Sequence, residues 1–148
     1  MEINGIAHII VTVSRFDECV AFYRRLLPFL GLSRIVHDEQ DYFYCIGGRT
    51  GFGVSRAADK YHRESFDQER PGLHHVCFRA RAREDVDAAW KLASELGARV
   101  VRAPGQGNWA PGYYSTLFED PDGVRLEINH IPGKGLLAAD PTEPGPTR

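Results

Sequence analysis

The stretch GLHHVCFRA at residues 72–80 has a counterpart near the start of the chain, GIAHIIVTV at residues 5–13. When the two stretches are aligned on their glycines, His75 falls opposite His8. Each stretch continues through an alternating apolar strand, a polar turn and an amphipathic helix to a Leu-Gly pair. A repeat of this kind indicates that the chain contains two copies of one supersecondary unit.

The remainder of each copy predicts the same order of elements. Three strands are expected after each helix, near residues 33–37, 42–46 and 51–56 in the first copy and near 99–102, 115–119 and 125–130 in the second. The sequences GGRT and DPDG are typical of hairpin turns. We therefore predict an α+β fold of two β-α-β-β-β modules, forming a curved, cup-like mixed sheet with the helices on its outer face.

One domain is expected over residues 1–131, with modules at 5–56 and 72–131 and a polar linker at 57–71. The Pro/Gly-rich segment 132–148 predicts a flexible tail.

Ser14 is the predicted N-cap of the first helix, which Pro28 and Gly31 should end.

Composition excludes several classes of protein. The 148 residues are 43% hydrophobic and 26% charged, with a formal net charge of −2, so no basic footprint for nucleic acid or an anionic membrane is expected. No apolar run approaches the ~20 residues of a membrane span, and no signal peptide is recognised at the N-terminus. The three cysteines lack metal-type spacing, which favours reduced thiols in a cytoplasmic protein.

Strand alternation selects the candidate site residues. His8 and His75 occupy matched positions and should face the same way, whereas His74, one residue out of phase, should face the opposite way. Glu127, between Leu126 and Ile128 in the last strand, is costly to bury unless it is paired or bound to a metal. Two imidazoles and a carboxylate facing one cavity form a set suited to Fe(II), Mn(II), Zn(II) or Ni(II). The alternative is a hydrogen-bonded core histidine and an edge carboxylate paired with an arginine.

The duplicated module, together with HIIVTV…AFYRRLLPFLGL, GLHHVCF and FEDPDGVRLEIN, resembles the vicinal oxygen chelate superfamily over residues 5 to about 131. That superfamily includes glyoxalase I, extradiol dioxygenases, fosfomycin-resistance enzymes and bleomycin-binding proteins. The resemblance implies a metal in a cupped sheet, bound at the positions of His8, His75 and Glu127.

Departures from the pattern separate the branches. Glyoxalase I usually adds a glutamate on the last strand of the first module, where this chain has Gly53 or its neighbour. Extradiol dioxygenases usually carry a tyrosine where this chain has Leu117. The anion-binding set of fosfomycin transferases is matched only in part, by Ser115. Bleomycin-binding relatives lack the metal ligands.

Further residues are candidates for substrate contact. Trp109, Tyr113 and Tyr114 lie in GQGNWAPGYYS, a segment that forms either one rim of the cavity or a loop packed by its own aromatics. Either tyrosine is a candidate acid or base. Arg79, Arg125 and Asn129 share the parity of the ligands, so they are expected either to orient a substrate or to reach solvent at the ends of the sheet.

The favoured hypothesis is a metalloenzyme that chelates two adjacent oxygens of a small molecule, with glyoxalase-like lyase or isomerase chemistry ahead of ring-cleaving dioxygenation. The alternative is a non-catalytic protein that sequesters a drug or metabolite. A homodimer is expected, and the cup closes either within one chain or across two.

Overall fold

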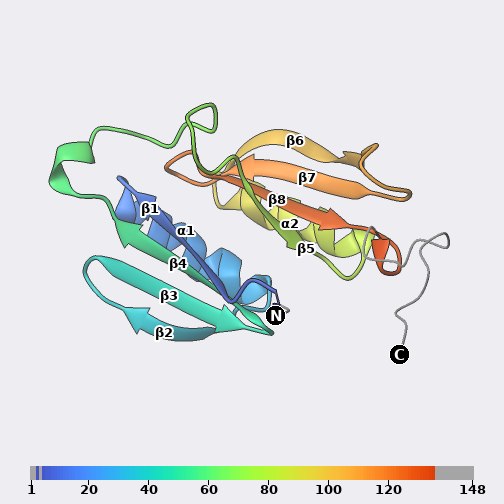
Figure 1. Cartoon of the computed structure of the whole chain (residues 1–148), viewed down its shortest axis with the longest axis horizontal. Helices are drawn as coiled ribbons and strands as arrows, with labels where there is room; N and C mark the ends of the chain where they lie inside the picture. The colour runs from blue at the N-terminus through green and yellow to red at the C-terminus, as the bar shows by residue number, and fades with distance from the viewer. Residues whose placement is uncertain (1–2, 4, 136–148) are drawn as a thin grey trace.

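Two four-stranded mixed sheets lie side by side in the structure, a computed structural model that describes residue 3 and residues 5–135 (Figure 1). The elements are β1 (His8–Val13), α1 (Phe16–Phe29), β2 (Arg34–Asp38), β3 (Tyr42–Gly47), β4 (Thr50–Arg56), the 3₁₀ turn η1 (Asp59–Tyr61), β5 (Val76–Arg79), α2 (Arg83–Glu95), β6 (Arg99–Gln106), β7 (Tyr114–Glu119) and β8 (Arg125–His130). The predicted α+β fold of two repeated modules is confirmed. Across residues 5–135 the strands form two separate sheets and not a closed barrel. The predicted tail lies almost wholly outside the described residues.

The two sheets have the same strand order and the same pairing. They run β1-β4-β3-β2 and β5-β8-β7-β6, with β1 parallel to β4 and β5 parallel to β8. In this register Ile10 lies opposite Gly53, and Cys77 lies opposite Glu127. Because the match of His8 to His75 also matches Ile10 to Cys77, Gly53 is the structural counterpart of Glu127.

Both helices cover the same side of the paired sheets and leave the other side free (Figure 1). Val11 and Val13 point into the core on the helix side, whereas His8 and Ile10 are exposed. Strands β1 and β5 form the two inner edges and run in opposite directions along the seam between the sheets (Figure 1). The core is continuous across this seam, where the Phe52 and Phe78 rings are 5.8 Å apart. Neither helix within the described residues is long and apolar enough to cross a membrane.

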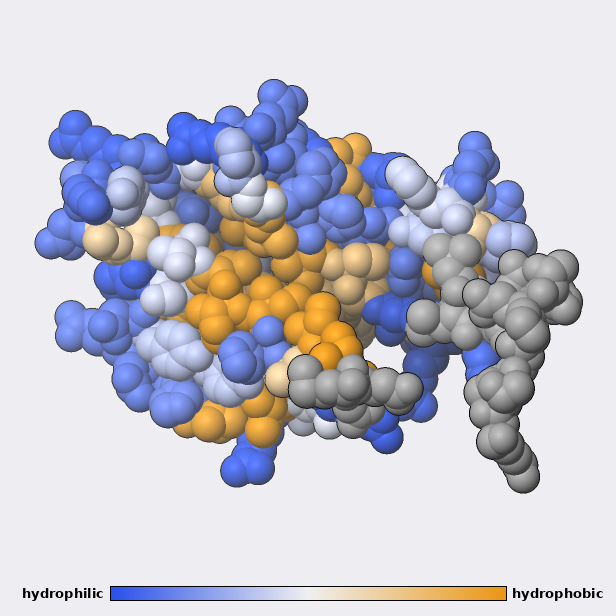
Figure 2. Space-filling model, viewed as in Figure 1, coloured by the Kyte–Doolittle hydropathy of each residue, from blue (hydrophilic) through white to orange (hydrophobic). Residues whose placement is uncertain are grey.

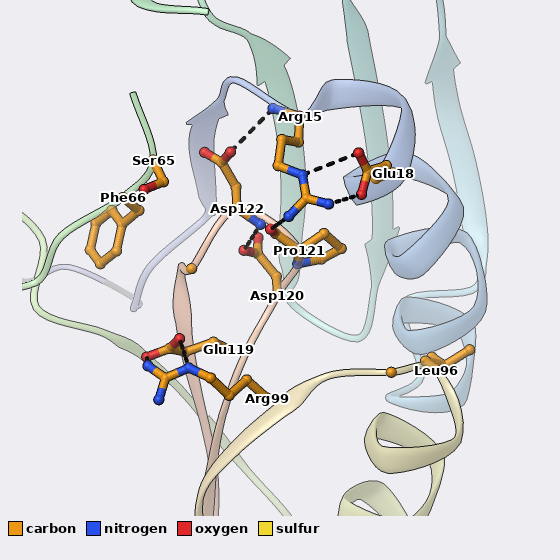
Figure 3. Close-up of a pocket in the computed structure, with 12 residues that line it drawn as sticks. Arg15, Glu18, Ser65, Phe66, Leu96, Arg99, Glu119, Asp120, Pro121 and Asp122 are labelled. Atoms are coloured by element: carbon orange, nitrogen blue, oxygen red, sulfur yellow. Dashed lines mark hydrogen bonds and ion pairs between the residues drawn. The ribbon is translucent and has the colours of Figure 1, made fainter. Parts of the chain in front are cut away.

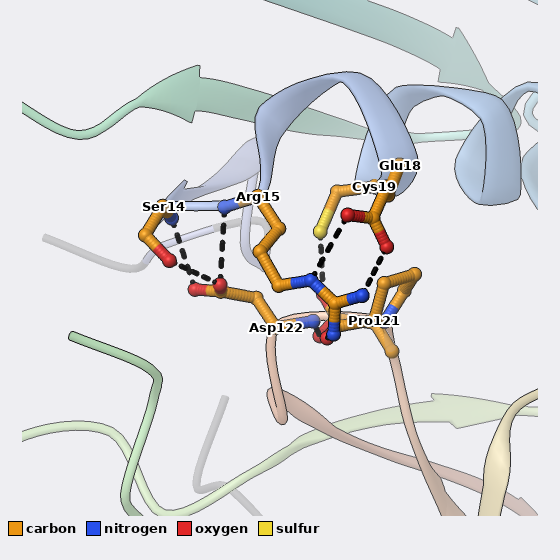
Figure 4. Close-up of polar contacts among 7 residues, drawn as sticks. Ser14, Arg15, Glu18, Cys19, Pro121 and Asp122 are labelled. Carbon is orange, nitrogen blue, oxygen red and sulfur yellow. Dashed lines mark hydrogen bonds and ion pairs between the residues drawn. The ribbon is translucent and has the colours of Figure 1, made fainter. Parts of the chain in front are cut away.

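The start of α1 is held by the second module, which differs from the prediction. The helix begins at Phe16, its N-cap residue is Arg15, and Ser14 makes no cap for it. Instead the Asp122 carboxylate accepts hydrogen bonds from the Ser14 and Arg15 backbone N–H groups, both at 3.1 Å, and from the Ser14 hydroxyl at 2.6 Å (Figure 4). An acid 107 residues away therefore holds the backbone at the N-cap of α1, where the Arg15 N–H is one of the four N–H groups that have no partner inside the helix. A local capping pattern cannot reveal such a partner.

The same turn, DPDG, buries a second carboxylate between the modules. Asp120 accepts hydrogen bonds from the backbone N–H groups of Asp122 and Val124, at 2.9 and 2.8 Å, and from the Tyr23 hydroxyl of α1 at 2.8 Å. Burial raises the pKa of Asp120 to about 6. A cavity of about 540 Å³ opens beside this turn, between the start of α1 and the end of α2 (Figure 3). The turn thus joins the two modules on the helix side of the seam.

Candidate metal and substrate site

Glu127 lies in the middle of β8, on the sheet face that the helices leave free. Its neighbours in sequence, Leu126 and Ile128, are both in the core on the helix side. Cys77 and Leu117 flank it in register on the two adjacent strands. Only 7% of Glu127 is exposed. A carboxylate shielded to this degree requires hydrogen bonds or an opposite charge, because burying it without a partner is costly.

Three side chains meet the Glu127 carboxylate. Oε1 accepts the Tyr113 hydroxyl at 2.6 Å and the Arg102 Nη2 at 3.1 Å. Oε2 lies 3.2 Å from the His75 Nε2. The arginine and the tyrosine therefore fix one oxygen, and the second oxygen is shared only with the imidazole among the described residues.

Arg102 is a member of this group that the sequence did not indicate. Its Nη2 also donates to the Ser115 hydroxyl at 2.8 Å, and its backbone carbonyl accepts the Thr116 hydroxyl at 2.9 Å. The strand register between β6 and β7 shifts on both sides of Arg102. Such bulges redirect a side chain, so parity along β6 cannot predict where it points. About half of this side chain, 48%, remains exposed, which leaves part of its guanidinium accessible to a ligand.

Tyr113 contributes a phenol to the same group. Burial and the hydrogen bond to Glu127 raise the pKa of Tyr113, so the phenol stays protonated and donates to the carboxylate. The Asn129 Oδ1, on the same strand as Glu127, is buried and has no hydrogen-bond partner within the described residues. This side of the site therefore combines a proton donor with an unpaired acceptor.

Cys77 borders Glu127 but is not activated. Burial and the Glu127 charge raise the pKa of the Cys77 thiol to about 12. In the metal-free protein this thiol is therefore protonated at neutral pH and is not an activated nucleophile, because nucleophilic attack requires the thiolate.

Two atoms of this group have the spacing of metal ligands. Ligands that bind one ion at ~2.0–2.2 Å and occupy adjacent positions are separated by roughly 3 Å. The His75 Nε2 and the Glu127 Oε2 are 3.2 Å apart, a distance that matches two adjacent ligands of one ion and also matches an ion pair. No cluster of three His, Cys, Asp or Glu side chains able to hold an ion occurs within residues 5–135.

The predicted third ligand, His8, does not join this pair within one chain. It begins β1 and is exposed, with its ring edge toward Tyr44 at a centroid distance of 6.3 Å. His75 directly precedes β5. Since β1 and β5 run in opposite directions, the two histidines lie toward opposite ends of the seam (Figure 1).

The other predicted site residues are scattered. Arg79 donates to the carbonyls of Ile131 and Gly133, both at 3.0 Å, and so binds the segment after β8. Arg125 pairs with Glu119 at 3.1 Å. Trp109 is 74% exposed.

Tyr114 points away from Glu127. Its hydroxyl donates to Asp87 of α2 at 2.8 Å, and Arg83 stacks over its ring. Only Tyr113 of the two candidate tyrosines therefore belongs to the group around Glu127.

His74 was expected to face away from His75, and this expectation is wrong. The two Nδ1 atoms are 2.8 Å apart, and the rings meet edge to face. Both residues precede β5, which begins at Val76. The alternation of a strand therefore does not apply to them.

Two repeated modules of this topology are consistent with the fold of the vicinal oxygen chelate class. A family model described as the Glyoxalase/Bleomycin resistance protein/Dioxygenase superfamily matches residues 5–128, and the chain belongs to this family.

The relatives carry different activities. The chain is 28% identical over 128 residues to the Metallothiol transferase FosB of Shouchella clausii, covering 86% of this chain and 80% of the relative. It is also 28% identical over 128 residues to the 2,2',3-trihydroxybiphenyl dioxygenase of Sphingomonas paucimobilis, of which it spans 41%, with 85% of this chain covered. A solved glyoxalase-family structure from Bacillus halodurans has a TM-score of 0.76 and 27% identity, covering 86% of this chain and 96% of that one. The family is thus shared, and the reactions are not.

Proposed function

We propose that this protein is a divalent-metal-dependent enzyme that binds a small oxygenated substrate through two adjacent oxygens, with glyoxalase-like lyase or isomerase chemistry. The carrying observation is the 3.2 Å separation between the His75 Nε2 and the Glu127 Oε2 on an accessible sheet face. Fe(II), Mn(II), Zn(II) and Ni(II) all suit such nitrogen and oxygen donors.

His8 of a second copy is proposed to complete the ligand set. Figure 2 shows an apolar area at the centre of the face that the helices leave free. Ile10 of β1 is a large apolar residue that is 39% exposed. Burying this surface between two copies is favourable, and it would place the exposed side chains of β1, His8 among them, against a partner. This arrangement supports a homodimer with a site shared between chains.

The residues around Glu127 are proposed to bind the substrate and to donate a proton to it. A bound metal supplies Lewis acidity to the chelated oxygens of the substrate. Arg102, paired with Ser115, is positioned to bind an anionic oxygen of the substrate beside the ligands. Tyr113 holds a proton at Oη, 2.6 Å from the Glu127 Oε1, and is the nearest candidate acid for a developing oxyanion.

A specific observation favours a second candidate, ring-cleaving dioxygenation. Leu117, opposite Glu127, lacks the phenol expected of that branch, but the hydroxyl of Tyr113 reaches the same carboxylate from another position. The dioxygenase relative gives this alternative further support.

Metal analysis tests the proposal. Purified protein loaded with Zn(II) or Mn(II) should bind close to one ion per chain, and both His8→Ala and Glu127→Ala should abolish this binding. Mixing equal amounts of the two variants should restore about a quarter of the sites, because half of the dimers are then mixed and each mixed dimer has one intact site of its two, made by one intact His8 and one intact His75–Glu127 pair. Weak binding that neither substitution changes would favour a non-catalytic binding protein instead.

The reaction class requires substrates. Catechols, α-ketoaldehyde–thiol adducts and fosfomycin with a thiol should be assayed with each of the four metals. Consumption of the thiol adduct supports the proposed chemistry, whereas oxygen uptake with a catechol establishes the second candidate.

A further inference from the structure

Two adjacent histidines face each other through the same ring atom. The Nδ1 of His74 and the Nδ1 of His75 are 2.8 Å apart, a hydrogen-bond distance. The other ring nitrogen of His75, Nε2, is the atom that lies 3.2 Å from the Glu127 Oε2. His75 therefore contacts His74 through one nitrogen and the carboxylate through the other.

The short Nδ1 contact couples the tautomers of the two rings. Of two facing ring nitrogens one must carry a hydrogen and the other a lone pair, because two lone pairs or two hydrogens would repel. If the Nε2 of His75 is to bind a metal, it must present its lone pair, so the hydrogen of the neutral ring is at Nδ1. That hydrogen then points at the Nδ1 of His74, which must accept it.

We infer that His74 is a positioning residue for the metal ligand His75. This inference rests on the proposed metal-dependent function. By accepting a hydrogen bond from His75 Nδ1–H, His74 holds the imidazole in the tautomer and orientation that direct Nε2 toward the position beside Glu127. Outer partners of this kind commonly orient metal-binding histidines, and the partner is usually a carboxylate, a carbonyl or water. Here the chain supplies a neighbouring imidazole.

The position of the pair in the chain explains how two successive side chains can meet. Residues 73–75 precede β5 and have no regular secondary structure. In a strand, successive side chains would point to opposite faces. The irregular backbone before Val76 instead lets the two rings meet.

A pair of substitutions at one position separates the hydrogen bond from the bulk of the side chain. His74→Asn places an amide oxygen close to where the imidazole Nδ1 lies, so it keeps an acceptor for His75. His74→Leu has a similar size and no acceptor. His62→Leu is the matched control, because His62 is an exposed histidine whose Nδ1 contacts the Asp59 carbonyl and whose Nε2 accepts a hydrogen bond from Arg63 Nε at 3.2 Å, both far from Glu127 in sequence.

Zn(II) affinity is the first readout, measured by calorimetry on the full-length protein. Loss of an outer partner typically weakens metal binding ~10–100-fold. We expect that loss in His74→Leu, recovery to within a few-fold of wild type in His74→Asn, and no change in His62→Leu. Circular dichroism of each variant reports whether the fold is intact.

Nitrogen-15 NMR of the imidazole rings is the second readout, and a merely structural role would not change it. In Zn(II)-loaded wild type and His74→Asn, His75 should show a hydrogen at Nδ1 and metal-bound Nε2. His74→Leu should lose this single form.

The possible outcomes separate the two claims. Equal affinity and equal His75 spectra in wild type and folded His74→Leu would overturn the role of His74 while the metal site stands. If wild type binds no Zn(II), the proposed function fails, and the role of His74 fails with it.

Discussion

The two modules share one backbone plan but present different chemistry on their free faces. At the position paired with Cys77, the second module has Glu127 with its arginine, tyrosine and histidine partners. At the equivalent position the first module has Gly53, paired with Ile10. A Cβ added at Gly53 would lie 2.6 Å from the Ile10 Cδ1 and 3.1 Å from the Tyr44 Cδ2. The two modules thus share one scaffold. In the first module, the Ile10 and Tyr44 side chains occupy the space that a side chain at position 53 would need.

The largest expected effect tests which half carries the metal chemistry. Glu127→Ala removes a proposed ligand, and we expect Zn(II) affinity to fall by more than ~100-fold, the upper end of the loss seen when only an outer partner is removed. Calorimetric titration measures it.

Glu119→Gln is the matched control for that experiment. Glu119 is another buried carboxylate of the second module, held by Arg99 and Arg125. Its substitution should leave affinity for Zn(II) unchanged. Equal losses in the two variants would point to general damage to the sheet and not to a ligand.

The hairpin turns of the two modules differ in whether they carry a buried acid, and this difference should change how stability depends on pH. DPDG in the second module carries the buried Asp120, whereas GGRT in the first carries no acid. The pKa of Asp120 is raised to about 6 in the folded protein, above the ~3.9 of an unfolded chain, so the folded state binds the proton more tightly. The stability from this group is fully present below pH ~4 and is lost as pH rises through about 6.

Urea unfolding at several pH values measures that loss. Between pH 4 and pH 7 wild type should lose about 2 kcal/mol relative to Asp120→Asn, since each unit of difference in pKa corresponds to ~1.4 kcal/mol. Parallel pH profiles for the two proteins would show that Asp120 titrates normally.

Gly53→Ala tests whether Ile10 fills the space at Gly53, the position in the first module that corresponds to Glu127. The added methyl group would meet the terminal Cδ1 of Ile10, which is 39% exposed and can move, and the Tyr44 ring at 3.1 Å, so we expect a loss of unfolding free energy near the lower end of the about 1–3 kcal/mol typical of overpacking. Ile10→Val removes the contacting Cδ1, so the double variant should recover part of the loss. Urea denaturation of wild type, both single variants and the double variant gives the coupling energy. Additive effects would mean that Ile10 does not fill this site.

The sequence predicted the repeat and the elements because those depend on local periodicity and on spacing within one module. It also selected Glu127 and His75, and the structure brings these two side chains within 3.2 Å of each other, whereas their binding of a metal stays a prediction. It missed Arg102, because two bulges in β6 break the alternation on which such predictions depend. It misjudged His74 because the strand begins only at Val76. It assigned a local cap to α1, because a carboxylate from the other module leaves no local pattern.

The smallest expected effect compares how the two modules begin their helices. The N-terminus of α2 is held by its own Asp85, which accepts the Ala82 backbone N–H at 3.0 Å. The N-terminus of α1 depends on Asp122 from the other module, through three hydrogen bonds. Losing a cap typically costs about 0.5–2 kcal/mol. We expect Asp122→Ala near the upper end and Asp85→Ala near the lower end, measured as urea unfolding free energies.

The two caps should also differ in which part of the molecule opens. Asp122→Ala breaks a contact between modules, so amide exchange should quicken in the first turn of α1 and in the DPDG turn together, two segments far apart in sequence. Asp85→Ala should quicken exchange only at the start of α2. If Asp122→Ala also affects only one segment, its carboxylate is a local cap that happens to come from the other module. If both segments respond, the DPDG turn is held by the first module, and this contact between the modules helps to hold the strand that carries Glu127.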